Sequence, residues 1–136
     1  MKSTIFFISI YFILIMTFVN CEDEITKLRR KMIMHASECY NQMNITKEEG
    51  QKMRADHDFA KKRLRCYSAC FMKKTNEMNE NNQLNMNTIS SIEHTLYPEK
   101  ADEMMKVLTS CSEKVKGIAD MCDLANAYEE CSHQKI

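Results

Sequence analysis

The residues best suited to covalent chemistry in this sequence are its cysteines. Seven cysteines occur among 136 residues, a pattern typical of small proteins that are cross-linked in an oxidising compartment. Six of them are separated by 26, 3, 40, 10 and 8 residues: Cys39, Cys66, Cys70, Cys111, Cys122 and Cys131. We expect these six to form disulfides, because their spacing describes a stapled framework and not a reactive centre.

Other chemistry is weakly represented. The sequence contains no Gly-rich phosphate loop, no nucleophile elbow and no His-Glu-x-x-His motif. His35 and Cys39 are one helical turn apart, as two metal ligands can be, but a cross-linked Cys39 is not free to bind a metal. We therefore predict that the protein is not an enzyme and that it holds neither a metal nor another cofactor.

The N-terminal segment predicts secretion. Lys2 is followed by an uncharged apolar run over residues 5–19, which is shorter than the roughly 20 residues needed to cross a bilayer. We expect residues 1–21 to be a secretory signal peptide. Cleavage after Cys21 would remove the odd cysteine, whereas cleavage after Asn20 would leave it as an N-terminal thiol.

The charge balance of the mature chain, residues 22–136, excludes some partners. Loss of the signal peptide removes Lys2 and no acidic residue, which leaves 18 basic and 19 acidic side chains. A nearly neutral domain lacks the strong basic surface that nucleic acids and anionic membranes favour. We expect neither nucleic-acid binding nor stable insertion into a membrane.

The backbone pattern of residues 22–136 predicts an all-α domain of six helices. The whole chain has only two glycines and one proline, and apolar residues recur at intervals of three or four. A Thr46-x-x-Glu49 pattern is typical of a helix start. The expected helices run from about Asp23 to Met43, Thr46 to about Asp56, Asp58 to Met78, Ile89 to Leu96 (capped by Asn87 or Thr88), Pro98 to Gly117 and Ile118 to Ser132, with a long loop in the asparagine-rich segment 76–87.

Helical geometry restricts how the cysteines can pair. Cys66 and Cys70 are one turn apart on one face of a helix, with parallel side-chain directions, so they should bond to two different neighbours. Cys122 and Cys131 are about half a turn out of phase, so different elements should hold the last helix from opposite sides. These limits leave several connectivities open.

The cysteine pattern resembles that of insect odorant-binding proteins of the pheromone and general odorant type. The three-residue gap between Cys66 and Cys70 and the eight-residue gap between Cys122 and Cys131 are the signature of that family, and Ala125 matches a common residue of its last helix. The resemblance covers nearly the whole mature chain. Carried over by position, it implies the bridges Cys39–Cys70, Cys66–Cys122 and Cys111–Cys131.

The resemblance implies a carrier of small hydrophobic molecules, secreted into sensillar lymph, haemolymph or a glandular fluid. An odorant receptor would be a further partner, and the carrier would be a monomer or a weak homodimer. Disulfides that restrict the unfolded chain allow the helices to enclose an apolar cavity instead of a solid core. Two alternatives use a similar scaffold: a salivary or venom effector, and a saposin-like protein that interacts with lipids.

The expected wall of the cavity is rich in methionine. The mature chain contains ten methionines and two phenylalanines, and methionine side chains adapt readily to different guests. Seven ligand-binding candidates are selected because they face inward in the helical pattern, and the family resemblance adds Ala125. One of the seven, Tyr128, also offers a hydroxyl to a polar ligand. The predicted ligand-binding residues are Phe71, Ile89, Ile92, Met104, Leu108, Met121, Ala125 and Tyr128.

Four histidines and one sequon complete the set of candidates. His35, His57, His94 and His133 are the candidates for a pH response, because histidine as a residue type changes charge near neutral pH. Only five residues follow the last cysteine, so no long C-terminal segment can refold into the cavity, and we predict at most a modest effect of pH on ligand release. The Asn44-Ile45-Thr46 sequon makes Asn44 a candidate for glycosylation.

Overall fold

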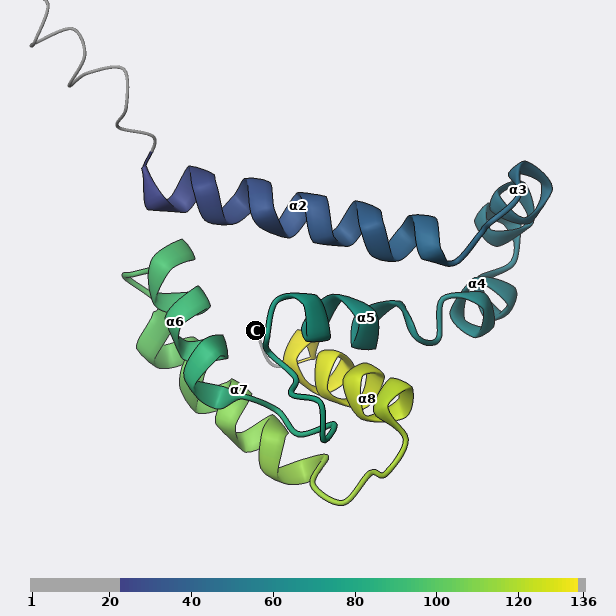
Figure 1. Cartoon of the computed structure of the whole chain (residues 1–136). Helices are drawn as coiled ribbons and strands as arrows, with labels where there is room; N and C mark the ends of the chain where they lie inside the picture. The colour runs from purple at the N-terminus through teal and green to yellow at the C-terminus, as the bar shows by residue number, and fades with distance from the viewer. Residues whose placement is uncertain (1–22, 135–136) are drawn as a thin grey trace, which may run out of the picture.

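A computed structural model of the chain describes residues 23–134, and the predicted signal peptide lies outside these described residues. Helices form almost all of the regular structure in this range (Figure 1), and the single β-bridge joins Met78 to Leu84. The all-α prediction is confirmed, but the expected number of six helices is wrong. The described residues form seven: α2 (Glu24–Gln42), α3 (Lys47–Ala55), α4 (His57–Arg63), α5 (Tyr67–Lys74), α6 (Met86–Leu96), α7 (Ala101–Lys114) and α8 (Met121–His133).

Side-chain caps determine where most of these helices begin. The Thr46 hydroxyl accepts a hydrogen bond from the Glu49 backbone N–H at 3.1 Å, and the Glu49 carboxylate accepts one from the Thr46 N–H at 2.9 Å. This reciprocal pair is the predicted capping box of α3. Asp23 caps α2 in a similar way by accepting from the Thr26 N–H at 2.6 Å, as the expected helix start near Asp23 requires.

The expected long helix over residues 58–78 is instead broken into α4 and α5. Between them, the Asn126 side chain donates a hydrogen bond to the Arg65 carbonyl at 2.7 Å. The guanidinium of Arg65 contacts Asp120 and Asp123 at 2.9 and 2.8 Å, and Cys66 is bonded to Cys122. These contacts to the start of α8 hold the chain in a turn, and a local apolar pattern contains no information about them.

Helix boundaries differ from the expectation near α6 and α7. The cap of α6 is Asn85, whose side chain accepts from the Thr88 N–H at 3.3 Å, so the expected cap at Asn87 or Thr88 is wrong. Pro98 lies in the turn before α7 and not in its first turn. Because a residue that precedes proline avoids the helical conformation, α6 ends at Leu96.

The asparagine-rich segment between α5 and α6 is the predicted long loop. Asn76 and Asn82 adopt left-handed backbone conformations with φ of 61° and 57°, which asparagine tolerates better than most residues. The Asn79 side chain accepts hydrogen bonds from the backbone N–H groups of residues 81 and 83, both at 2.9 Å. Local bonds of this kind order the loop without a helix.

The core lies between α5, α6, α7 and α8. In Figure 1, α2 runs along one side of this group, and α3 and α4 lie beyond the C-terminal end of α2. Met78 and Ile89 are each 2% exposed, and Tyr128 is 6% exposed. Helix α2 contributes only Cys39 to the buried residues, and α3 and α4 contribute none. Most of the apolar stabilisation therefore comes from residues after α4.

Three disulfides join these elements, in the pairs that the family resemblance implies. Cys39 of α2 is bonded to Cys70 of α5, Cys66 to Cys122 of α8, and Cys111 of α7 to Cys131 of α8, with Cα–Cα distances of 5.9, 4.6 and 5.7 Å. Cys66 and Cys70 bond to different elements, as do Cys122 and Cys131, in agreement with the helix phases. Helix α8 is held at both ends.

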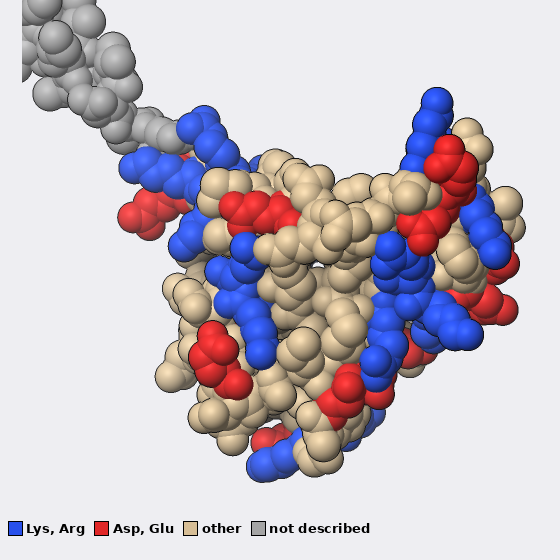
Figure 2. All heavy atoms as spheres, turned by 45° about the vertical axis from the view of Figure 1, so that its right-hand side comes forward, with Lys and Arg blue, Asp and Glu red and all other residues tan. Residues whose placement is uncertain are grey.

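The surface is mixed in charge. Figure 2 shows acidic and basic side chains next to one another around a mostly uncharged central area. The peripheral helices α3 and α4 are attached through Arg63, whose guanidinium donates to the Glu49 carboxylate at 2.9 Å and to the Met43 carbonyl at 2.7 Å. No helix within residues 23–134 combines the length and the apolar character needed to cross a membrane.

Candidate functional site

A pocket of about 190 Å³ lies in the core between α5, α6, α7 and α8. We call it the inner pocket. It brings together four of the eight predicted ligand-binding residues, one from each of these helices: Phe71, Ile89, Leu108 and Tyr128. The remaining residues that line it are Tyr67, Ser68, Met72, Glu77, Glu93, Glu129 and Ser132.

The other four predicted residues lie elsewhere. Ala125 of α8 is completely buried in the protein core, and Met121, one turn earlier in the same helix, packs against this core. Met104 is half-buried on α7 and does not line the inner pocket. Ile92 lines a different hollow, on the side of α6 that faces α2. The structure therefore divides the predicted set between the pocket, the packed core and a second hollow, and it places Met104 in none of them.

Acidic side chains give the inner pocket a polar end. Burial raises the pKa of the Glu77 carboxyl above its ordinary value, although the Thr75 hydroxyl donates to it at 2.6 Å. Burial also raises the pKa of Glu93, and the negative charge of Glu77 adds to this shift. One carboxylate oxygen of Glu93, Oε2, is buried without a hydrogen-bond partner. These two acids are held in an environment that disfavours their charged forms.

The Tyr128 hydroxyl belongs to the same polar end. It is buried without a hydrogen-bond partner, and its pKa is raised first by burial and then by the charges of Glu77 and Glu93. A buried hydroxyl is usually hydrogen-bonded. The inner pocket thus combines an apolar wall with two carboxyls and a phenol that are incompletely satisfied by the protein itself.

The sequence prediction missed the acidic residues, although one of them had a signal. Glu93 follows Ile89 by four residues and Ile92 by one, which places it on the inward face of α6. A charged residue on an apolar helical face is unusual and could have been selected for that reason. Glu77 lies in the asparagine-rich loop, where no periodic pattern indicates which side chains point inward.

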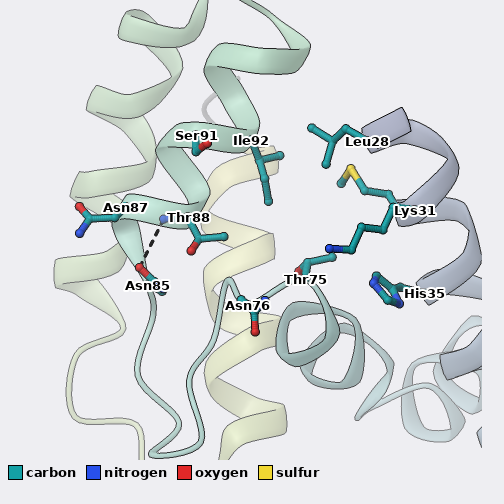
Figure 3. Close-up of a pocket in the computed structure, with 11 residues that line it drawn as sticks. Leu28, Lys31, His35, Thr75, Asn76, Asn85, Asn87, Thr88, Ser91 and Ile92 are labelled. Atoms are coloured by element: carbon teal, nitrogen blue, oxygen red, sulfur yellow. Dashed lines mark hydrogen bonds between the residues drawn. The ribbon is translucent and has the colours of Figure 1, made fainter. Parts of the chain in front are cut away.

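A second hollow, of about 500 Å³, separates α2 from α6 and the start of the asparagine-rich loop. We call it the outer groove. In Figure 3, Leu28 and Ile92 face each other across it, and the amine end of Lys31 points toward Thr75. Most of its other lining side chains are amides and hydroxyls: Asn76, Asn85, Asn87, Thr88 and Ser91. It is therefore more polar than the inner pocket.

Histidines on α2 and α6 contact neighbouring acidic residues. His35 lines the groove, and its Nδ1 lies 3.4 Å from the Glu38 carboxylate. The Lys74 ammonium donates to that carboxylate at 2.7 Å, and this bond, with the His35 contact, lowers the pKa of Glu38. His94 lies on α6 with its Nε2 3.2 Å from Asp102. A hydrogen bond with the Ser90 carbonyl and this contact raise the pKa of His94.

The glycosylation candidate lies just after α2, and the histidine–cysteine pair lies within α2. Asn44 is exposed after α2 with a left-handed φ of 48°, and its side-chain amide donates to the Gln42 carbonyl at 3.4 Å. Cys39 is disulfide-bonded, so it is not available beside His35 as a metal ligand. Within residues 23–134, no group of three or more His, Cys, Asp and Glu side chains is arranged to hold a metal ion.

Comparisons with known proteins indicate the family to which this chain belongs. The family model described as the PBP/GOBP family matches residues 22–135 of this chain. General odorant-binding protein 19d of Drosophila melanogaster is 30% identical over 105 residues, which cover 74% of this chain and 69% of that protein. No solved structure gives a significant match. The family match spans nearly the whole chain, so this protein belongs to the PBP/GOBP family of odorant-binding proteins.

Proposed function

We propose that this protein is a secreted carrier that binds a small hydrophobic molecule in the inner pocket. The observation that supports this proposal is the convergence of Phe71, Ile89 and Leu108 from three helices around a space of about 190 Å³. In a chain of the odorant-binding family, such a space favours a carrier over the effector and lipid-interacting alternatives.

The pocket volume sets the size of the proposed ligand. At about 190 Å³, the inner pocket has room for several water molecules. Such a space suits a guest with a short hydrocarbon body and not a long-chain lipid. Burial of about 200 Å² of ligand hydrocarbon would stabilise the complex by about 5 kcal/mol before the entropic cost of association.

The biological setting of the carrier is part of the proposal. We propose that residues 1–21 direct the chain to an extracellular fluid, such as sensillar lymph, haemolymph or a glandular secretion. There it would act as a monomer or weak homodimer and deliver its ligand to an odorant receptor. The carrier would need no catalytic group and no cofactor, because transport requires only reversible burial of the ligand.

A displacement assay with two pocket-filling variants tests the proposal. A fluorescent apolar probe is bound to the wild-type protein and displaced by small volatile hydrocarbons, alcohols and esters. Leu108→Phe fills the inner pocket and should weaken probe binding at least tenfold. Ser91→Phe fills the outer groove and should leave probe binding unchanged. Thermal unfolding of both variants must stay cooperative, so that a loss of binding reports on the pocket.

Two results would contradict the proposal. If the wild-type protein neither binds the probe nor retains a small molecule in native mass spectrometry after mild purification, the carrier function is wrong. If Ser91→Phe abolishes binding and Leu108→Phe does not, the ligand occupies the outer groove.

A further inference from the structure

The inner pocket is lined by acids without a basic residue. Its described lining includes the carboxyl groups of Glu77, Glu93 and Glu129, and none of the lysine, arginine or histidine side chains of residues 23–134 lines it. Glu129 lies at the exposed side, where it accepts a hydrogen bond from the Ser68 hydroxyl and lies 3.7 Å from the His133 Nε2. The two inner acids, Glu77 and Glu93, have no comparable cation in the pocket lining.

The acids are accompanied by an independent sign of a missing partner. Tyr128 is only 6% exposed, it lines the same pocket, and its hydroxyl has no hydrogen-bond partner among the described residues. Glu77 and Glu93 line the same pocket, and after burial their charges also raise the pKa of this hydroxyl. Glu93 Oε2 is likewise buried and unpartnered. Two separate side chains, Glu93 and Tyr128, therefore offer acceptor oxygens in the pocket that receive no hydrogen bond from the described residues.

Apolar side chains form the body of the pocket wall, and Ser68, Glu129 and Ser132 add polar groups to its lining. Phe71 and Met72 from α5, Ile89 from α6 and Leu108 from α7 form its body. The pocket is therefore amphipathic, with hydrocarbon surface along most of its length and acceptor oxygens at one end. A ligand that matches it carries a hydrogen-bond donor with positive charge on a short apolar body.

We infer that the inner pocket selects small apolar molecules that carry a protonated amine, with the ammonium group held by Glu77, Glu93 and the Tyr128 hydroxyl. This inference rests on the carrier function proposed above and specifies its ligand class. An alkylammonium has several N–H donors, so it can satisfy both carboxylates and the phenol oxygen at once. It also neutralises charge that the protein leaves uncompensated in a buried site.

Other head groups fit less well. An alcohol supplies one donor and no charge, so at most one of the three acceptor groups gains a hydrogen bond. A carboxylate ligand brings further negative charge toward Glu77 and Glu93, where the low local dielectric strengthens repulsion. The titratable groups that line the pocket are Tyr67 on α5, Glu77 in the loop, Glu93 on α6, and Tyr128 and Glu129 on α8, and α7 contributes the uncharged Leu108.

A matched ligand series tests this inference. Hexylamine, 1-hexanol and hexanoate each contain six carbons and carry different head groups. At pH 7 the amine is protonated, because alkylamines titrate near pH 10. Each is titrated against the full mature protein by displacement of a fluorescent apolar probe and by calorimetry. We expect hexylamine to bind about tenfold more tightly than 1-hexanol, as a charged hydrogen bond is stronger than a neutral one. Hexanoate should bind least.

Single substitutions identify the acids responsible. Glu93→Gln and Glu77→Gln keep the side-chain shape and remove the charge, and each should reduce the preference for hexylamine over 1-hexanol to about threefold or less. The matched control Glu80→Gln makes the same change in the exposed part of the asparagine-rich loop and should keep the tenfold preference. Binding of 1-hexanol should remain within about twofold in all three variants, which shows that the pocket is still formed.

The outcomes separate the two proposals. If 1-hexanol displaces the probe and hexylamine binds no better, or if both glutamine variants keep the amine preference, the inference about amines is overturned while the carrier function stands. Equal affinity for hexanoate and hexylamine has the same meaning. If the wild-type protein does not bind the probe and none of the three ligands gives a calorimetric signal, both the ligand class and the carrier function are refuted.

Discussion

The unpartnered hydroxyl of Tyr128 makes a specific prediction about stability. Replacement of this residue by phenylalanine keeps the ring in the core and removes a polar group that is buried without a hydrogen bond. A buried, unsatisfied polar group costs about 1–3 kcal/mol. Because the hydroxyl faces a pocket that has room for water, we expect a value near the lower end. Tyr128→Phe should therefore stabilise the empty protein by about 1 kcal/mol, which corresponds to a rise in melting temperature of about 4 °C.

Urea unfolding followed by far-ultraviolet circular dichroism, with the disulfides intact, measures this difference. The slope of the free energy of unfolding against urea should be unchanged, so that a higher midpoint reports higher stability. Tyr97→Phe is the matched control, because Tyr97 is 48% exposed and loss of its hydroxyl should change stability by less than about 0.5 kcal/mol.

The opposite result would refute the reasoning. If Tyr128→Phe lowers the free energy of unfolding by about 1 kcal/mol or more, the hydroxyl makes a hydrogen bond in the empty protein. It would then not be free for a ligand, and the assignment of Tyr128 to the polar end of the pocket would be wrong.

Three further predictions concern the cap of α3, one disulfide and the half-buried acid Glu93. Thr46→Ala should lower stability by about 1 kcal/mol in urea unfolding through loss of the α3 cap. Joint replacement of Cys111 and Cys131 by alanine, which opens a loop with a sequence separation of 20, should cost about 3 kcal/mol in the same assay. Burial raises the pKa of Glu93 above its ordinary value of 4.5, so its ionised form opposes folding and stability should increase as the pH falls from 7 toward 4.5. Glu93→Gln should show a smaller increase in urea midpoint over this range. The difference between the wild-type protein and this variant gives the contribution of Glu93 to the pH dependence, separately from that of His94.

Local signals in the sequence were sufficient to place most helices. The capping pair at Thr46 and Glu49 involves residues three positions apart, and the asparagine-rich loop is marked by composition, so both were predictable. The break between α4 and α5 was not, because Arg65 is held there by Asp120 and Asp123, more than 50 positions later in the chain. A periodic pattern records the preference of a helix and not the distant contacts that interrupt it.

The candidate site was predictable to a similar degree. Inward helical phase selected Ile89 and Leu108 because a residue that faces the core also faces a space within the core. The same reasoning misplaced Ile92, since α6 has neighbours on two sides and its apolar surface faces both the inner pocket and α2. The half-buried acid Glu77 was not predictable, because the conformation of a loop determines which of its side chains point inward.

The distribution of the disulfides separates the walls of the inner pocket into fixed and adjustable parts. Helices α5, α7 and α8 are each covalently attached to another element, whereas α6 contains no cysteine and is held by non-covalent contacts. We therefore expect α6, which carries both Ile89 and Glu93, to be the helix that moves when ligands of different size bind. The breadth of guests that this carrier accepts would then depend on how far one unstapled helix can tilt, and substitutions at its packing surface would retune selectivity without altering the covalent frame.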